Sequence, residues 1–324
     1  MSASVGYCSC FGDTIRDMLR FRASLGFSES TYACELKAFD RFCMENYPLE
    51  NNLTKALALE WGSKRPSEKV NNHRVRLFAL RQLGKYMNLK GLNAYIVPMS
   101  IVEKYQMFEP YLFTEKELPV FFKTIDTIPA FSQSAFSEYT LPVFFRIAYG
   151  CGLRPNELFD LRRFDVNLRD RNLFIYNSKT KRDRLVKMTE DLNELCGKYD
   201  LIAQQRFPNR HWFFHIDKEI VSRKSWFEYR LAKYWKMAEL DKRLGRCPRI
   251  YDFRHNFATN VLFKWFDEGK DIMSLMPYLS AYMGHVEMHS TLYYVHLLPE
   301  RLRRNNAFDW SKFEALLPEV PREE

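Results

Sequence analysis

Apolar residues recur every three or four positions through the first hundred residues of the chain. This is the spacing of one helix face, so the pattern predicts a compact helical domain. Short polar residues favour the position before the first helical turn, and four of them precede the periodic stretches: Asp13, Ser30, Thr54 and Ser67. From about residue 95 to residue 110 the periodicity stops, and Pro98 and Pro110 indicate a linker.

The pattern changes after this linker. Helical periodicity resumes at residues 114–117, where Thr-Glu-Lys-Glu can form a capping box. Residues 172–178 have strand composition, and residues 184–188 can pair back on them as a hairpin. Near the C-terminus, Pro318 ends a short apolar helical stripe that consists of Trp310, Phe313, Leu316 and Leu317.

The length of 324 residues is enough for roughly two domains, each with its own core. We expect a mainly α protein with a helical domain at residues 1–105. The second domain, at residues 106–324, is expected to be α+β with a small β-hairpin sheet and a C-terminal tail helix.

Composition adds a preference for a polyanionic partner. The chain has 49 Lys and Arg against 40 Asp and Glu, a net charge of +9. Charge alone does not separate nucleic acid from an acidic membrane surface. However, no apolar run approaches the ~20 residues of a membrane span, and no basic segment followed by an apolar one opens the chain. We therefore expect a cytoplasmic protein without a membrane partner. The seven scattered cysteines are typical of reduced thiols rather than of a zinc site.

Almost all the charge on the helix expected after Ser67 has one sign. Its basic side chains are Lys69, His73, Arg74, Arg76, Arg81 and Lys85. A solvated charged face is the default interpretation of such a set. A face that tracks DNA phosphates is at least as well supported, because almost all of the charge on this helix has one sign. Candidate DNA contacts on this helix are Arg74, Arg76 and Arg81.

Four separated segments carry side chains suited to a phosphodiester: Gly-Leu-Arg-Pro-Asn-Glu-Leu at 152–158, Tyr-Asp-Phe-Arg-His at 251–255, Gly284-His285, and Tyr-Tyr-Val-His at 293–296. The planar fork of arginine matches the geometry of phosphate oxygens. Taken alone, Arg154 would be a surface arginine with a salt-bridge partner. The chain has 18 tyrosines, and Tyr294 is distinguished from the others only by its spacing of nine residues from His285. At these positions together, the chain resembles a tyrosine recombinase of the phage integrase family.

This resemblance implies an N-terminal core-binding domain with a SAM-like helical fold, followed by a catalytic domain. The residues it marks as catalytic are Arg154, Lys179, Tyr251, Arg254, His285 and Tyr294, with Glu157 in support. Arg154 and Arg254 would hold the phosphate oxygens and His285 would donate a hydrogen bond to them. Tyr294 would be the nucleophile. Tyr293 and Tyr282 are interpreted as core aromatics, and Cys151 as a small buried residue.

The hairpin carries the implied general acid, which protonates the 5′-oxygen leaving group. The family's usual spacing selects Lys179, and Lys181 is a rival because a hairpin tip can slip register by two residues. Lys181, Arg182 and Arg184 are expected to bind DNA, the arginines through backbone phosphate.

One position departs from the family pattern. The family usually has a histidine three residues before the second arginine, and here that position is Tyr251. A phenol can donate a hydrogen bond to phosphate, but its reference pKa of about 10 makes it a poor base near neutrality. Tyr251 is therefore a phosphate ligand or the mark of a weakened enzyme, and we favour the active enzyme. His255 is expected to be structural.

The resemblance implies an integrase or transposase of a mobile element that cuts and rejoins double-stranded DNA through a 3′-phosphotyrosyl intermediate. It implies no metal, ATP or other cofactor. The expected assembly is a homotetramer on paired DNA sites, nucleoid-associated when bound, with accessory DNA-bending or element-encoded proteins as further partners. The tail helix near Trp310 would dock on a neighbour or on its own domain. Two alternatives stay open: a type IB topoisomerase, and a catalytically silent DNA-binding relative.

Overall fold

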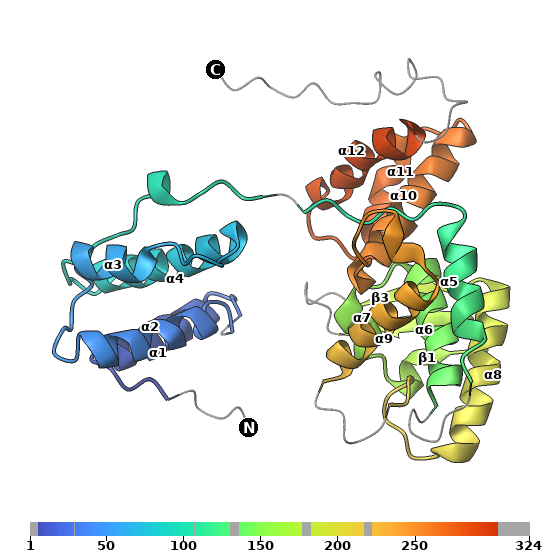
Figure 1. The fold of residues 1–324 in the computed structure, drawn as a ribbon, viewed down its shortest axis with the longest axis horizontal. Coiled ribbons are helices and arrows are strands. Elements are labelled where there is room, and N and C mark those ends of the chain that lie inside the picture. The colour runs from blue at the N-terminus through green and yellow to red at the C-terminus, as the bar shows by residue number, and fades with distance from the viewer. Residues whose placement is uncertain are drawn as a thin grey trace. The chain divides into compact units, whose positions relative to one another are not determined.

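The computed structural model describes residues 6–28, 30–106, 108–129, 136–176, 183–216 and 222–303. The chain divides into two compact units, residues 1–108 and 109–324, each with its own hydrophobic core (Figure 1). As expected, the protein is mainly helical with a small antiparallel sheet. Within the described ranges, no helix is long and apolar enough to cross a membrane.

The described part of the N-terminal unit is built from α1 (Gly12–Ser24), α2 (Ala33–Asn46), α3 (Lys55–Gly62) and α4 (Val70–Leu89), followed by a 3-10 turn at Met99–Ile101. The apolar positions of these helices pack together around Phe11, Phe39 and Leu83, which are fully buried. Burial of this stripe stabilises the unit more than helix propensity does, because isolated helices of this length are marginal in water.

The predicted caps have mixed outcomes. Thr54 caps α3 as expected, accepting a hydrogen bond from the Leu57 amide at 3.3 Å. The other three predictions are each wrong by two residues: the residues before α1, α2 and α4 are Phe11, Tyr32 and Lys69. Asp13 lies inside α1, where its carboxylate pairs with Arg16 in the next turn.

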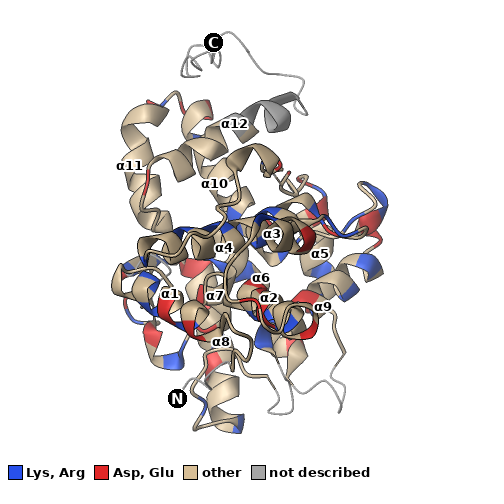
Figure 2. Ribbon diagram, turned by 90° about the vertical axis from the view of Figure 1, so that its left-hand side faces the viewer, with Lys and Arg blue, Asp and Glu red and all other residues tan. Residues whose placement is uncertain are grey.

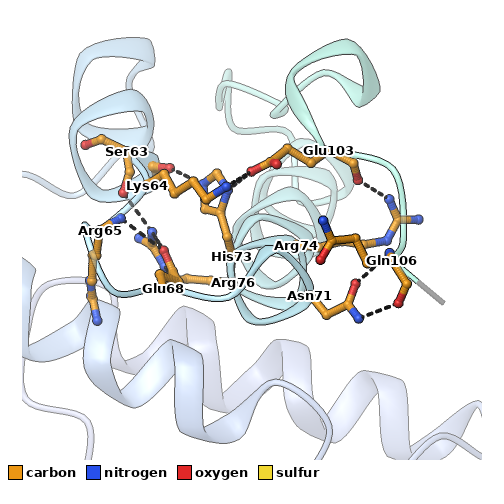
Figure 3. A network of polar contacts seen from close by, with 11 residues as sticks. Ser63, Lys64, Arg65, Glu68, Asn71, His73, Arg74, Arg76, Glu103 and Gln106 are labelled. Atoms are coloured by element: carbon orange, nitrogen blue, oxygen red, sulfur yellow. Dashed lines mark hydrogen bonds and ion pairs between the residues drawn. The ribbon is translucent and has the colours of Figure 1, made fainter. Parts of the chain in front are cut away.

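Figure 3 shows a polar network around the first turns of α4. Arg76 is only 4% exposed, and its Nε and Nη2 donate to the Glu68 carboxylate at 2.8 and 2.7 Å. Its remaining donors bind the carbonyl oxygens of Trp61 and Ser63. The expectation that Arg76 contacts DNA is therefore corrected: this guanidinium is buried and saturated by its own domain.

The segment expected to be a linker is partly packed on α4. Asn71 exchanges hydrogen bonds with the backbone of Gln106 at 2.8 and 3.0 Å. The Glu103 carboxylate lies 2.8 Å from Lys64 Nζ and 3.3 Å from His73 Nδ1, and Arg74 donates to the Glu103 carbonyl (Figure 3). This segment thus belongs to the N-terminal unit through Gln106.

The C-terminal unit contains α5 (Glu117–Asp126), α6 (Ser137–Cys151), α7 (Pro155–Phe159), α8 (Glu190–Arg206), α9 (Arg223–Met237), α10 (Ile250–Asp267), α11 (Ile272–Met283) and α12 (His289–Arg303), with 3-10 turns at Arg163–Asp165 and Leu240–Lys242. Its described sheet has the order β1 (Val166–Asn167), β2 (Asn172–Ile175), β3 (Arg184–Lys187). The predicted hairpin is confirmed, with Leu173 opposite Val186. The predicted capping box also forms, between Thr114 and Glu117.

Two glycine turns set the positions of the elements that carry the candidate site. Gly152 ends α6 with φ of +59°, and a Cβ there would lie 2.3 Å from the Phe257 ring. Gly284 ends α11 with φ of +66°. Both conformations are left-handed, which only glycine adopts without strain. The two turns let Arg154 and His285 follow their helices immediately.

Candidate active site

Arg154 stands at the N-cap of α7, two residues after the Gly152 turn. Its backbone amide donates to Glu157 Oε2 at 2.8 Å, and its Nη1 donates to Glu157 Oε1 at 2.9 Å. Its Nη2 donates to the carbonyl of Gly284, which joins the first arginine motif to the Gly284-His285 motif. The side chain is partly exposed, at 15%.

Glu157 is the hub of this network. Besides Arg154, it accepts hydrogen bonds from Arg184, whose Nη1 and Nη2 lie 2.9 and 2.8 Å from its two oxygens. Burial opposes ionisation of Glu157, but the hydrogen bonds and charge of Arg184 and the bonds from Arg154 outweigh it and hold the pKa below its usual value. Glu157 therefore remains ionised and orients two arginines.

Arg184 was expected to bind backbone phosphate, and its geometry corrects this expectation. Its side chain is 9% exposed, and its Nε donates to the Tyr282 carbonyl at 2.9 Å while its two Nη atoms bind Glu157. All three nitrogens of the guanidinium are thus used inside the protein. Sequence reasoning missed this role because Glu157 lies 27 residues away in sequence.

Arg254 is fully buried on α10. Its Nη1 donates to the carbonyl of Gly152 and its Nη2 to the carbonyl of Met283, each at 2.7 Å. Nη2 also lies 2.9 Å from Nε2 of His285. Among the described residues, its Nε has no hydrogen-bond partner. A buried arginine donor without a partner is unusual in a folded protein.

His285 follows the Gly284 turn and lies between Arg254 and Thr291. Because Arg254 donates to Nε2, the proton of the neutral ring is on Nδ1, which donates to Thr291 Oγ1 at 2.7 Å. Burial, and then the positive charges of Arg254 and Arg154, lower the pKa of His285 to about 4. The ring is neutral near pH 7 in this arrangement.

Tyr294 on α12 lies against the same cluster and is 2% exposed. Its ring stacks on His285 with centroids 6.1 Å apart and an interplanar angle of 13°. Burial raises the pKa of Tyr294 to about 12, while the charge of Arg254 acts in the opposite direction. Arg154, Arg254, His285 and Tyr294, which are up to 140 residues apart in sequence, thus form one site.

Tyr251 lies at the edge of this site. It is on the first turn of α10, 37% exposed, with its ring 4.9 Å from that of His255. His255 in turn faces Tyr293 and Tyr294 at 6.0 and 5.5 Å. Burial lowers the pKa of His255 to about 3, so this ring is neutral as well. Its place among three aromatic rings fits the expected structural role.

Other predicted residues have simpler outcomes. Lys179, Lys181 and Arg182 lie outside the described residues, as does the tail near Trp310. Cys151 is buried, and burial raises the pKa of its thiol. Tyr282 is partly buried with its hydroxyl 3.2 Å from the Lys187 carbonyl, and burial raises its pKa.

Arg249 and Asp252 were not singled out by the sequence. Arg249 precedes α10 and contacts Asp252 through its backbone amide at 2.7 Å and its Nη2 at 3.2 Å. This arrangement repeats that of Arg154 and Glu157 at α7. The signal that could have found it is the same Arg-x-x-acid spacing at the start of both motif helices.

The fold thus brings two arginines, a histidine and a tyrosine together in one predominantly helical unit. The model of the phage integrase family matches residues 111–301, and the chain belongs to this family. It is accordingly a tyrosine-type recombinase, a class of enzyme that cleaves and rejoins DNA.

Two relatives match nearly the whole chain. "Putative integrase/recombinase y4rE" of Sinorhizobium fredii is 24% identical over 88% of this chain and 91% of its own length. "Putative integrase/recombinase y4rB" of the same organism is 25% identical over 91% of this chain and 95% of its own. Both alignments extend into the N-terminal unit, beyond the residues matched by the family model.

Solved structures share the fold. XerH site-specific recombinase bound to its difH substrate has a TM-score of 0.65 and 19% identity, covering 94% of this chain and 85% of that one. The Tn1549 transposon integrase in complex with transposon right end DNA has a TM-score of 0.62 and 14% identity, covering 92% and 99%.

Proposed function

We propose that this protein is a site-specific recombinase, an integrase or transposase of a mobile element, that uses Tyr294 as its nucleophile. The observation that carries the proposal is the convergence of Arg154, Arg254 and His285 beside the buried Tyr294 ring. Three cationic or polar donors around one phenol suit a phosphodiester whose negative charge grows as the phenol attacks.

In the proposed reaction, non-bridging phosphate oxygens accept hydrogen bonds from Arg154 and Arg254. A phosphate bound beside Arg254 would compete with His285 Nε2 for the Nη2 donor, and its charge would favour a protonated, donating His285. The Tyr294 oxygen bonds to phosphorus as the bond to the 5′-oxygen breaks. Lys179 gives the leaving oxygen its proton, and the phenol of Tyr294 releases its own proton to water as its oxygen bonds to phosphorus.

The product is a 3′-phosphotyrosyl linkage and a free 5′-hydroxyl. Because this linkage conserves the energy of the original bond, a hydroxyl from a second duplex can reverse the step without ATP. We propose that four protomers carry out this exchange on two duplexes, with accessory DNA-bending proteins.

In the N-terminal unit, the proposed DNA contacts are on α4, which carries basic side chains and no acidic ones (Figure 2). Arg74 and Arg81 stay candidates, because each is only partly buried and uses Nη1 for a backbone carbonyl. Lys69, which immediately precedes α4, and Lys85 on the helix are both exposed. Arg76 is not part of this surface.

Covalent capture tests the proposal. Wild-type protein is incubated with nicked fragments of its own genetic locus and denatured, and the attached DNA is sequenced. We expect attachment at one short sequence, lost in Tyr294→Phe and kept in Tyr293→Phe. The exposed Tyr278 provides the matched control, Tyr278→Phe. Attachment to every fragment would instead identify a topoisomerase. No attachment by a protein that still binds DNA would identify a silent relative.

A further inference from the structure

We infer that Arg184 is a positioning residue of the recombination site, which acts by occupying Glu157 and so keeps Arg154 oriented toward the phosphate. This inference rests on the proposed roles of Arg154 and Tyr294. It concerns a residue at the start of β3 that is remote in sequence from both arginine motifs.

The first step in the argument is the filling of the Glu157 carboxylate. A carboxylate offers about four acceptor positions. Here Oε1 accepts from Arg154 Nη1 and Arg184 Nη1, and Oε2 accepts from the Arg154 amide and Arg184 Nη2. All four bonds are between 2.8 and 2.9 Å, and the Glu157 side chain is 7% exposed. Arg184 therefore supplies half of the hydrogen bonds that this buried charge requires.

The second step is what Glu157 would do without Arg184. Arg154 is the other guanidinium within its reach, and a lone arginine–carboxylate pair favours the bidentate fork. Turning Arg154 into that fork would withdraw its Nη2 from the Gly284 carbonyl and from the side where His285 lies. Arg184 holds the fork position itself, so that Arg154 makes a single side-chain bond to Glu157.

The third step is the contact with Gly284. A Cβ at Gly284 would lie 3.0 Å from Arg184 Nη1 and 3.2 Å from its Cδ. Arg184 Nε also donates to the Tyr282 carbonyl in the last turn of α11. The same guanidinium thus contacts the turn that presents His285 and the carboxylate that orients Arg154. It stabilises the relative position of two catalytic motifs from a third element.

The test compares Arg184→Gln and Arg184→Lys with wild type in two assays, DNA affinity and the single-turnover rate of covalent attachment at saturating DNA. Displacement of a catalytic group by about 1 Å can reduce a rate on the order of 100-fold. We expect a loss of that size in the attachment rate for both variants, with DNA affinity within about twofold of wild type. Lysine should not restore the rate, because a single ammonium cannot occupy both carboxylate oxygens.

A double-mutant cycle separates positioning from mere stability. If Arg184 acts through Arg154, Arg184→Lys should slow attachment further by less than about threefold in an Arg154→Lys background, since coupled effects are not additive. Multiplicative losses would overturn the inference. Arg146→Gln is the matched control, because Arg146 forms a comparable bidentate pair with Asp126 away from the site. Its attachment rate should equal that of wild type.

Two further outcomes are informative. Should Arg184→Gln fail to fold by thermal unfolding, Arg184→Lys, which retains the charge, carries the test alone. Normal attachment rates in Arg184→Lys, with Tyr294→Phe inactive, would overturn this inference and leave the proposed function intact. Attachment by Tyr294→Phe would instead overturn the proposed function.

Discussion

Arg76 in the N-terminal unit and Arg254 in the C-terminal unit are both buried arginines, and they differ in how completely they are hydrogen-bonded. Arg76 directs Nε, Nη1 and Nη2 to Glu68 and to two backbone carbonyls. Arg254 has no carboxylate partner among its described hydrogen bonds, and its Nε has no partner among the described residues. Arg76 is thus saturated within its own unit, whereas Arg254 keeps a buried donor unsatisfied, which is rare in folded proteins.

The largest expected effect comes from substituting Arg254, the arginine with the unsatisfied donor. Arg254→Lys keeps one positive charge but cannot reach Gly152, Met283 and the phosphate with the same planar fork. We expect the single-turnover attachment rate to fall on the order of 100- to 1000-fold, the cost of losing one fixed transition-state donor. Binding of duplex DNA measured by anisotropy should persist. A rate within threefold of wild type would contradict the proposed role.

The complementary change is Arg76→Met. It leaves Glu68, whose side chain is 10% exposed, without its partner, and breaking a buried pair in this way costs about 3–5 kcal/mol. We expect the free energy of unfolding of the N-terminal unit to fall by that amount in urea. Arg76→Met combined with Glu68→Leu should recover much of it, because an apolar pair leaves no buried charge. Attachment per folded molecule should not change.

These two arginines also show how far sequence reasoning reached. The motifs around Arg154, Arg254, His285 and Tyr294 were found from local spacing, and the structure brings these residues together. The partners of Arg76 and Arg184 were missed, since a basic residue on a helix or strand gives no sign of whether it faces solvent. Glu68 is eight residues from Arg76 and Glu157 is 27 from Arg184. Only the fold determines that each pair meets.

The two units should lose stability over different pH ranges during acid titration. His255 in the C-terminal unit has a pKa lowered from 6.5 to about 3, chiefly by burial. The unfolded chain therefore binds a proton below about pH 6.5 that the native state excludes, so stability falls as the pH drops from 6.5 toward 3. The slope from one such group is at most about 1.4 kcal/mol per pH unit. Hydrogen exchange of peptides from α10 should report it, and His255→Gln should reduce it. The contribution of His285, whose pKa is lowered to about 4, should remain.

The N-terminal unit should respond only at lower pH. Hydrogen bonds from Arg76 lead the causes that lower the pKa of Glu68 below 4.5, against the opposing effect of burial. An acid of this kind stabilises the fold above its unfolded pKa, and the contribution is lost as the pH falls through the native pKa. Peptides from α4 should therefore keep their protection between pH 6.5 and 4.5. Equal loss of protection in α4 and α10 over that range would contradict the assignment.

The smallest expected effect concerns Tyr251, which precedes Arg254 by one turn of α10. Its ring is 37% exposed and packs beside His255, so its hydroxyl can reach a bound phosphate without disturbing the core. A hydrogen bond of this kind contributes about 0.5–1.5 kcal/mol, so Tyr251→Phe should slow attachment about two- to tenfold. Tyr251→His, which restores the donor usual in the family, should keep the wild-type rate. Equal rates for Tyr251→Phe and wild type would remove Tyr251 from the site and leave Arg254, His285 and Arg154 as its phosphate donors.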